Sequence, residues 1–209
     1  MAKKPGLEAA YALKSTEDVK ELYAAWAGSY DSDFAAQNDY DLHHQVARGY
    51  ADRGGVGPVL DVGAGTGRVG VALAALGVGP IHGTDISGEM LAQADAKGCY
   101  ASVFVSDITR PLTDIADGTY AGIVRAGVFT LGHLGPEPIG ELIRITQTGG
   151  LLALAVNATH WEAAGFEDAF AALGAQVTDL TRTPVSIYTE AATHDHARDQ
   201  SMLVTFRAA

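Results

Sequence analysis

The stretch that decides the fold is Val59–Gly70, VLDVGAGTGRVG. A short run suited to a buried strand enters a turn with glycine at every second position from Gly63 to Gly67, and a helical pattern begins at Arg68. Glycine lets the backbone bend sharply and lets a ligand approach without a Cβ in the way, while the start of a helix offers unpaired N–H groups. The segment therefore predicts a strand, turn and helix that together bind a ligand.

The spacing of the glycines does not by itself identify the ligand. Gly65, Gly67 and Gly70 satisfy G-x-G-x-x-G, a pattern found in dinucleotide-binding proteins. Asp85 follows at the end of the next apolar run, 18 residues beyond Gly67. A carboxylate there can accept two hydrogen bonds from ribose hydroxyls, which suits several nucleotide cofactors equally.

Two further carboxylates make the pattern more specific. Asp61 lies two residues before the first glycine of the turn, where a dinucleotide-binding strand normally carries an apolar residue, and Asp107 ends a third apolar run, where it could accept from an exocyclic amine such as that of adenine. Each carboxylate also has a structural alternative. Asp61 could cap a turn, Asp85 could cap the following helix, and Asp107 could pair with Arg110.

Beyond this turn, short apolar runs alternate with helical stretches, which indicates an α/β fold with a mainly parallel sheet and helices on both faces. The runs expected to form strands are PVLDVG, GPIHGTD, YASVFVSD, YAGIVRAGVF and GLLALAVN. The helical stretches between them are Arg68–Leu76, Ser87–Lys97 and Pro138–Gln147. At the end of the chain, Val177–Tyr188 and Ser201–Arg207 read as two strands of an antiparallel hairpin.

The first 55 residues have helical character. Apolar residues recur every three or four positions up to Trp26, and a second helix is expected over Tyr40–Asp52, before glycines and a proline break the pattern. We therefore expect a helical lid at residues 1–55 and an α/β ligand-binding domain at residues 56–209, within one domain overall. Tyr23, Trp26 and Tyr30 also have the spacing of ordinary core residues, which is the alternative to a lid.

Composition excludes several classes of protein. The chain has 209 residues, 47% of them hydrophobic, and a formal net charge of −11, which describes a folded globular protein and disfavours a nucleic-acid partner. The single cysteine, Cys99, excludes a disulfide within the chain and a paired-cysteine zinc site, so we expect a cytoplasmic protein without a metal. The apolar runs are shorter than the roughly 20 residues of a membrane span, so no membrane partner is expected. The oligomeric state is left open.

Taken together, the motifs resemble the class I S-adenosylmethionine-dependent methyltransferases over about residues 20–175. The likeness is carried by LDVGAGTG, GTDISGEML, SDI, YAGIVRAGVF and GGLLALAVN. The stretch GVFTLGHLGPEPIGELIRITQTGGLL is similar to the small-molecule branch that includes the ubiquinone/menaquinone type and the Williams-Beuren-region methyltransferase-like proteins. The resemblance implies a doubly wound, mostly parallel seven-stranded sheet with an N-terminal helical lid and a C-terminal antiparallel hairpin. It also implies S-adenosyl-L-methionine as cofactor, with S-adenosyl-L-homocysteine as product.

The resemblance assigns site residues in three groups. Those around the methionine moiety, with its ammonium near backbone carbonyls and the turn organised by the first carboxylate, are Asp61, Gly63, Ala64, Gly65 and Ala126. Those around the ribose and the adenine are Asp85, Ile86, Met90, Asp107 and Ile108. The aromatic residues expected to lie over the cofactor are Tyr23 and Tyr30.

The implied reaction is direct displacement of the methyl group by a small-molecule acceptor. Alignment of the two reactants alone can contribute roughly 7 to 11 kcal/mol, so a dedicated catalytic side chain is optional. His133 and His160 follow the fourth and fifth expected strands and are candidate general bases, although most histidines in such loops are structural. A nicotinamide-dependent oxidoreductase and a non-catalytic S-adenosylmethionine-binding module stay open as alternatives.

Overall fold

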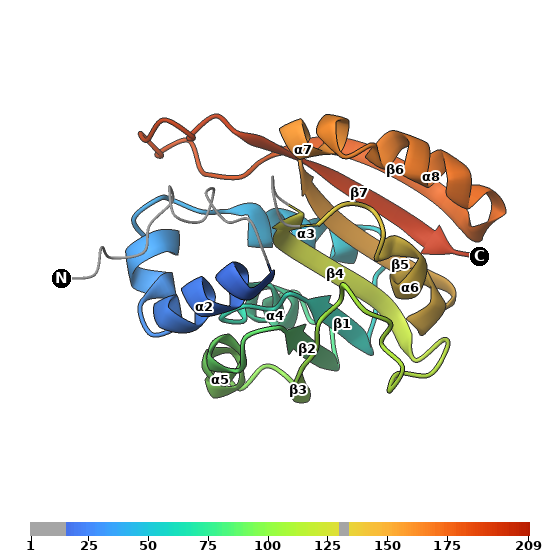
Figure 1. Ribbon diagram of the computed structural model, residues 1–209, viewed down its shortest axis with the longest axis horizontal. Helices are drawn as coiled ribbons and strands as arrows, with labels where there is room; N and C mark the ends of the chain where they lie inside the picture. Colours follow the sequence, from blue (N-terminus) through green and yellow to red (C-terminus); the bar gives the residue numbers. More distant parts are fainter. Residues whose placement is uncertain (1–15, 130–133) are drawn as a thin grey trace.

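The computed structural model describes residues 16–129 and 134–209, which form one seven-stranded sheet with helices on both faces (Figure 1). The strands are β1 (Val59–Val62), β2 (Ile81–Asp85), β3 (Ser102–Val105), β4 (Tyr120–Phe129), β5 (Thr146–Asn157), β6 (Val177–Ser186) and β7 (Gln200–Ala208). Their order in the sheet is β3-β2-β1-β4-β5-β7-β6, with β7 antiparallel to both of its neighbours and the first five strands parallel. The expected mostly parallel sheet with a C-terminal antiparallel hairpin is confirmed.

The helices include elements that were not predicted from the sequence. They are α2 (Thr16–Trp26), a π-helix (Asp31–Ala35), α3 (Leu42–Asp52), α4 (Arg68–Ala75), α5 (Gly88–Ala96), α6 (Ile139–Ile145), α7 (Ala158–Ala163), α8 (Phe166–Leu173) and a 3₁₀ turn (Gly174–Gln176). The pair α7 and α8 was not predicted from the sequence. Between β3 and β4, where no helix was expected, residues 106–119 form turns.

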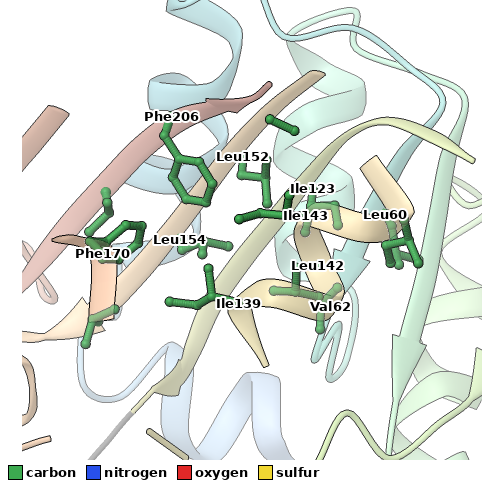
Figure 2. Close-up of a cluster of buried hydrophobic side chains, with 14 of the residues drawn as sticks. Leu60, Val62, Ile123, Ile139, Leu142, Ile143, Leu152, Leu154, Phe170 and Phe206 are labelled. Carbon is green, nitrogen blue, oxygen red and sulfur yellow. The ribbon is translucent and has the colours of Figure 1, made fainter. Parts of the chain in front are cut away.

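Strand β1 lies at the centre of the sheet, and all four of its residues are buried. Leu60 and Val62 belong to a large apolar cluster with α6, α8 and the inner strands (Figure 2), whereas Val59 belongs to the cluster on the opposite face, under α3 and α4. Fully burying one such side chain contributes about 1.5 to 3 kcal/mol. The sheet is therefore held from both sides, and the turn after β1 projects from a rigid base.

Helix α3 is part of the helix layer on the sheet. Val46, Ala47 and Tyr50 are fully buried in the cluster over β1, β4 and β5. The Tyr50 hydroxyl donates to Val56 O at 2.7 Å, and a Cβ on Gly122 of β4 would lie 2.0 Å from that hydroxyl. The described residues of the expected lid therefore fall into two structural parts. Unlike α3, α2 and the π-helix lie away from the sheet, at the left of Figure 1, and α2 packs beside α5.

Within the two described segments, every helix is too short or too polar to cross a lipid bilayer.

Candidate cofactor site

The turn between β1 and α4 is tied to the end of β2. Gly63 N and Ala64 N both donate to Thr84 O, at 2.8 and 3.0 Å. Gly63, Gly65 and Gly67 all have positive φ, from 54° to 87°, a conformation that is strained for other residues. A Cβ on Gly65 would meet no atom within 4 Å. One side of the turn is therefore open to a ligand.

Asp85 joins this turn to the start of α5. Its Oδ2 accepts from Gly65 N at 2.9 Å and its Oδ1 from Ser87 N at 3.0 Å. The N-cap of α5 is Ser87, whose hydroxyl accepts from Met90 N, so Asp85 is not the helix cap. Burial raises the pKa of Asp85, while the N–H donors and the Arg125 guanidinium act to lower it. The carboxylate lies where three segments of the site meet.

Arg125 is a fully buried side chain of β4. Burial lowers the pKa of Arg125 to about 9, and the negative charge of Asp85 opposes that shift. The guanidinium therefore stays positively charged at neutral pH. The sequence carried a signal for it, a single arginine inside the apolar run YAGIVRAGVF, but only the structure shows that it acts electrostatically on Asp85.

Asp61 is completely buried on β1. Its Oδ2 accepts from the Tyr100 hydroxyl at 2.7 Å, and within the described residues its Oδ1 has no hydrogen-bond partner. Burial raises the pKa of Asp61 to about 7, and the charge of Asp85 adds to the rise, whereas the hydrogen bond from Tyr100 opposes it. Tyr100 in turn accepts from Gly70 N at 3.2 Å. Asp61 is therefore linked to the first turn of α4 through a tyrosine that sequence reasoning did not identify.

Tyr100 also explains two of the glycines near the turn. A Cβ on Gly70 would lie 2.3 Å from the Tyr100 ring, and one on Gly83 2.8 Å from it. In particular, the third glycine of the G-x-G-x-x-G pattern makes room for this ring.

Asp107 and Ile108 follow the end of β3. Asp107 Oδ1 accepts from both the backbone N and the hydroxyl of Thr109, at 2.9 and 2.6 Å. Its Oδ2 lies 3.5 Å from Nε of Arg110, which is 81% exposed, so the ion pair considered as an alternative is present. Ile108 packs against the apolar cluster on the α6 face. The structure thus shows a local role for Asp107 and leaves its binding to adenine a prediction.

The aromatic residues of the N-terminal segment pack on α5. The rings of Trp26 and Tyr30 meet edge to face at 5.2 Å, and the Tyr23 ring lies about 6 Å from both. Trp26 and Met90 are buried in this cluster, which has Tyr23 and Tyr30 half-buried at its side. Burial raises the pKa of the Tyr30 hydroxyl well above its usual value of 10. The structure therefore groups three of the predicted cofactor residues, Tyr23, Tyr30 and Met90.

Ile86 lies just beyond the carboxyl end of β2, Ala126 lies within the last four residues of β4, and both are partly exposed. The hydroxyl of Tyr40 lies close to β4 beside Ala126. A Cβ added to Gly127 would be 2.9 Å from this hydroxyl. The Tyr40 ring meets the ring of Tyr188 edge to face at 6.1 Å. The loop after β6 thus reaches the same edge of the sheet, as its course in Figure 1 also shows.

The two candidate bases are placed differently. His160 is buried at the start of α7, where its Nε2 donates to Leu134 O at 2.6 Å and its ring meets Phe166 edge to face. This geometry favours the structural alternative, and a base would have to use Nδ1. His133 lies outside the described residues.

Residues 59–150 match the family model described as a methyltransferase domain. Over these residues the chain therefore matches a methyltransferase domain. It is also 30% identical over 156 residues to human methyltransferase-like protein 27. That alignment covers 71% of this chain and 61% of the human protein, so the chain spans about three fifths of the relative's length.

Solved structures show the same methyltransferase fold. A TehB-like SAM-dependent methyltransferase from Corynebacterium glutamicum is 21% identical, with a TM-score of 0.59 over 93% of this chain and all of that one. A methyltransferase in complex with the Trm112 methyltransferase activator of Haloferax volcanii is 20% identical, with a TM-score of 0.61 over 89% of this chain and 97% of that one.

The cofactor implied for this methyltransferase domain is S-adenosyl-L-methionine, and the residues present fit it. The space beside Gly65 is open, a carboxylate lies at the end of β2, and the buried Asp61 Oδ1 has no hydrogen-bond partner within the described residues. The contacts of each predicted site residue with the cofactor stay predictions.

Proposed function

We propose that this protein transfers the methyl group of S-adenosyl-L-methionine to a small-molecule acceptor in the cytoplasm. The observation that carries the proposal is the contact between Gly65 N and Asp85 Oδ2 at 2.9 Å, which joins the glycine turn to the carboxylate that would hold the ribose. The net charge of −11 supports a small acceptor over a nucleic acid, because phosphate backbones are repelled by an acidic protein.

The proposed roles follow the geometry of the site. The backbone of Gly63, Ala64 and Gly65 would carry the methionine moiety, with the Ala126 carbonyl near its ammonium, and Asp85 would accept hydrogen bonds from the ribose hydroxyls. Residues proposed to hold the adenine are Ile86, Met90, Asp107 and Ile108. Asp61 would support the turn from behind, through Tyr100.

When bound, S-adenosylmethionine supplies a methyl group on a positively charged sulphur, so the donor is already activated. The protein then needs chiefly to align the acceptor and to exclude water, and alignment can contribute roughly 7 to 11 kcal/mol. Tyr23 and Tyr30 are proposed to exclude water, since their segment lies outside the helix layer of the sheet. His133 and His160 stay the candidate bases for an acceptor that must lose a proton.

Addition of S-adenosylhomocysteine should raise the melting temperature of the protein. At 100 times its dissociation constant, a ligand that binds only the folded state contributes about 2.7 kcal/mol. For a chain of this size that corresponds to roughly 5 to 10 °C. Thermal unfolding with S-adenosylhomocysteine and, separately, with NADH is the measurement. A shift with NADH alone would reverse the cofactor assignment and favour the oxidoreductase alternative.

Amide hydrogen exchange should separate the N-terminal helices into two classes. Residues 22–35, in α2 and the π-helix, should exchange more slowly when S-adenosylhomocysteine is bound, because a lid opens for entry and closes over its ligand. Helix α3 should be protected in both states, since it is buried in the core. Equal protection of residues 22–35 with and without ligand would show that they too are permanent core.

A further inference from the structure

Asp31, the first residue of the π-helix, connects the N-terminal segment to two other parts of the site. Its Oδ1 accepts from the Thr66 hydroxyl at 2.7 Å, and its Oδ2 accepts from Lys97 Nζ at 2.6 Å. Thr66 is a buried residue of the glycine turn, and Lys97 is the C-cap of α5. One carboxylate therefore bridges the turn and the helix between which the cofactor is expected to lie.

The charges around Asp31 keep it ionised. Burial acts to raise its pKa, but hydrogen bonds from Lys97 and Thr66 and the nearby positive charges outweigh burial, so the pKa of Asp31 is below its usual value. Arg68 contributes to this field, with Nη1 at 3.8 Å from Asp31 Oδ1. The carboxylate accepts from its partners at neutral pH as a charged group, which strengthens each hydrogen bond.

Arg68 extends the contact to the helix layer of the sheet. Its Nη2 donates to Nε2 of His43, a buried residue of α3, at 3.2 Å. Burial lowers the pKa of His43 to about 3, with the positive charge of Arg68 adding to the effect, so the ring is neutral and can accept this bond. Asp31 is thus connected, through Arg68, to an element that does not move with the lid.

We propose that Asp31 is a positioning residue that holds the N-terminal segment closed over the glycine turn and so slows dissociation of the cofactor. The inference rests on the proposed function. Tyr30 directly precedes Asp31, so the carboxylate fixes the position of an aromatic side chain proposed to cover the cofactor. The side chains of Lys97 and Asp31 are 25% and 39% exposed, so the contact can open to water, as a reversible lid requires.

Stopped-flow measurement of S-adenosylhomocysteine binding tests the proposal. The Asp31→Ala variant should release the ligand about tenfold faster, because a charge-assisted contact that holds only the closed state is lost, while the association rate should stay within about twofold. Thr66→Val should accelerate release and Thr66→Ser should restore it, since serine keeps the hydroxyl. Glu21→Gln, which removes one negative charge from an exposed position of α2, is the matched control and should behave as the wild type.

Salt dependence distinguishes positioning from a merely structural role. In the wild type, release should accelerate as the salt concentration rises from about 0.05 to 0.5 M, because the Asp31–Lys97 pair is screened. Asp31→Ala and Lys97→Met should lose most of this dependence. If Asp31→Ala releases S-adenosylhomocysteine at the wild-type rate, the inference about Asp31 is wrong, but the proposed function is unaffected. No binding of S-adenosylhomocysteine by the wild type would overturn the proposed function and, with it, the inference.

Discussion

The Asp61→Asn variant should gain about 2 to 3 kcal/mol of unfolding free energy relative to the wild type as the pH rises from 5 to 8. The pKa of Asp61 is raised to about 7 in the folded protein, from a usual value of 3.8. The folded state therefore binds a proton more tightly than the unfolded state does. The stabilisation of the fold by this bound proton is complete below pH 3.8 and is lost as the pH rises to 7. The interval from pH 5 to 7 spans two pH units, each worth about 1.4 kcal/mol.

Asparagine is the informative substitution because it resembles the protonated carboxyl group in shape and is neutral at every pH. Its side-chain oxygen can still accept from the Tyr100 hydroxyl. The shifted pKa of His43 does not disturb the comparison. His43, whose pKa is lowered to about 3, makes the fold more stable as the pH rises to 6.5, but it does so in both proteins.

Urea unfolding at pH 5, 6, 7 and 8 measures the effect. The same substitution at exposed Asp114 is the control and should leave the difference from wild type constant with pH. If the stabilities of Asp61→Asn and the wild type change in parallel over this range, Asp61 is ionised throughout and burial does not control its protonation.

The Asp85→Ala variant should bind S-adenosylhomocysteine roughly 10- to 100-fold more weakly than the wild type. A hydrogen bond to a charged group contributes about 1.5 to 3 kcal/mol, and the ribose hydroxyls are proposed to donate to this carboxylate. The variant also loses the contacts with Gly65 N and Ser87 N, so its melting temperature without ligand should fall as well. Isothermal titration calorimetry measures the affinity apart from this loss of stability.

Ser87→Ala is the matched control for that experiment. It removes the N-cap of α5 and should cost about 1 kcal/mol of stability, but it leaves the Asp85 carboxylate in place. Its affinity for S-adenosylhomocysteine should therefore stay close to that of the wild type. If both variants lose affinity equally, Asp85 acts on the cofactor only by shaping the start of α5.

The parts of the fold that sequence predicted are those with short-range causes. Glycines that need positive φ, next to a buried strand, mark the turn at Gly63–Gly67, and alternation of apolar runs with helical stretches gives the parallel sheet. The alternation of apolar runs and helical stretches also placed Asp85 at the end of a strand. Ser87 is the N-cap of α5, and the sequence could not decide between Asp85 and Ser87, because Asp and Ser are both favoured at that position.

Contacts between distant residues could not be predicted in the same way. Asp31 and Lys97 are 66 positions apart, and nothing in either sequence neighbourhood indicates their pairing. Helix α3 has an apolar stripe that includes Val46 and Tyr50, but a stripe of this kind does not say whether it covers a sheet or a ligand. Because α2, the π-helix and α3 follow one another in sequence, only the structure shows that α3 belongs to the helix layer of the sheet.

The position of Tyr100 gives a second reason, besides backbone conformation, for glycines in this part of the chain. Its ring fills the space that side chains at Gly70 and Gly83 would need, and its hydroxyl connects Asp61 to the backbone of α4. The requirement for glycine at these two positions therefore comes from an aromatic neighbour on a third segment. The three positions are therefore coupled: a smaller residue at position 100 would remove the main obstacle to a side chain at positions 70 and 83, and an aromatic residue there would restore it.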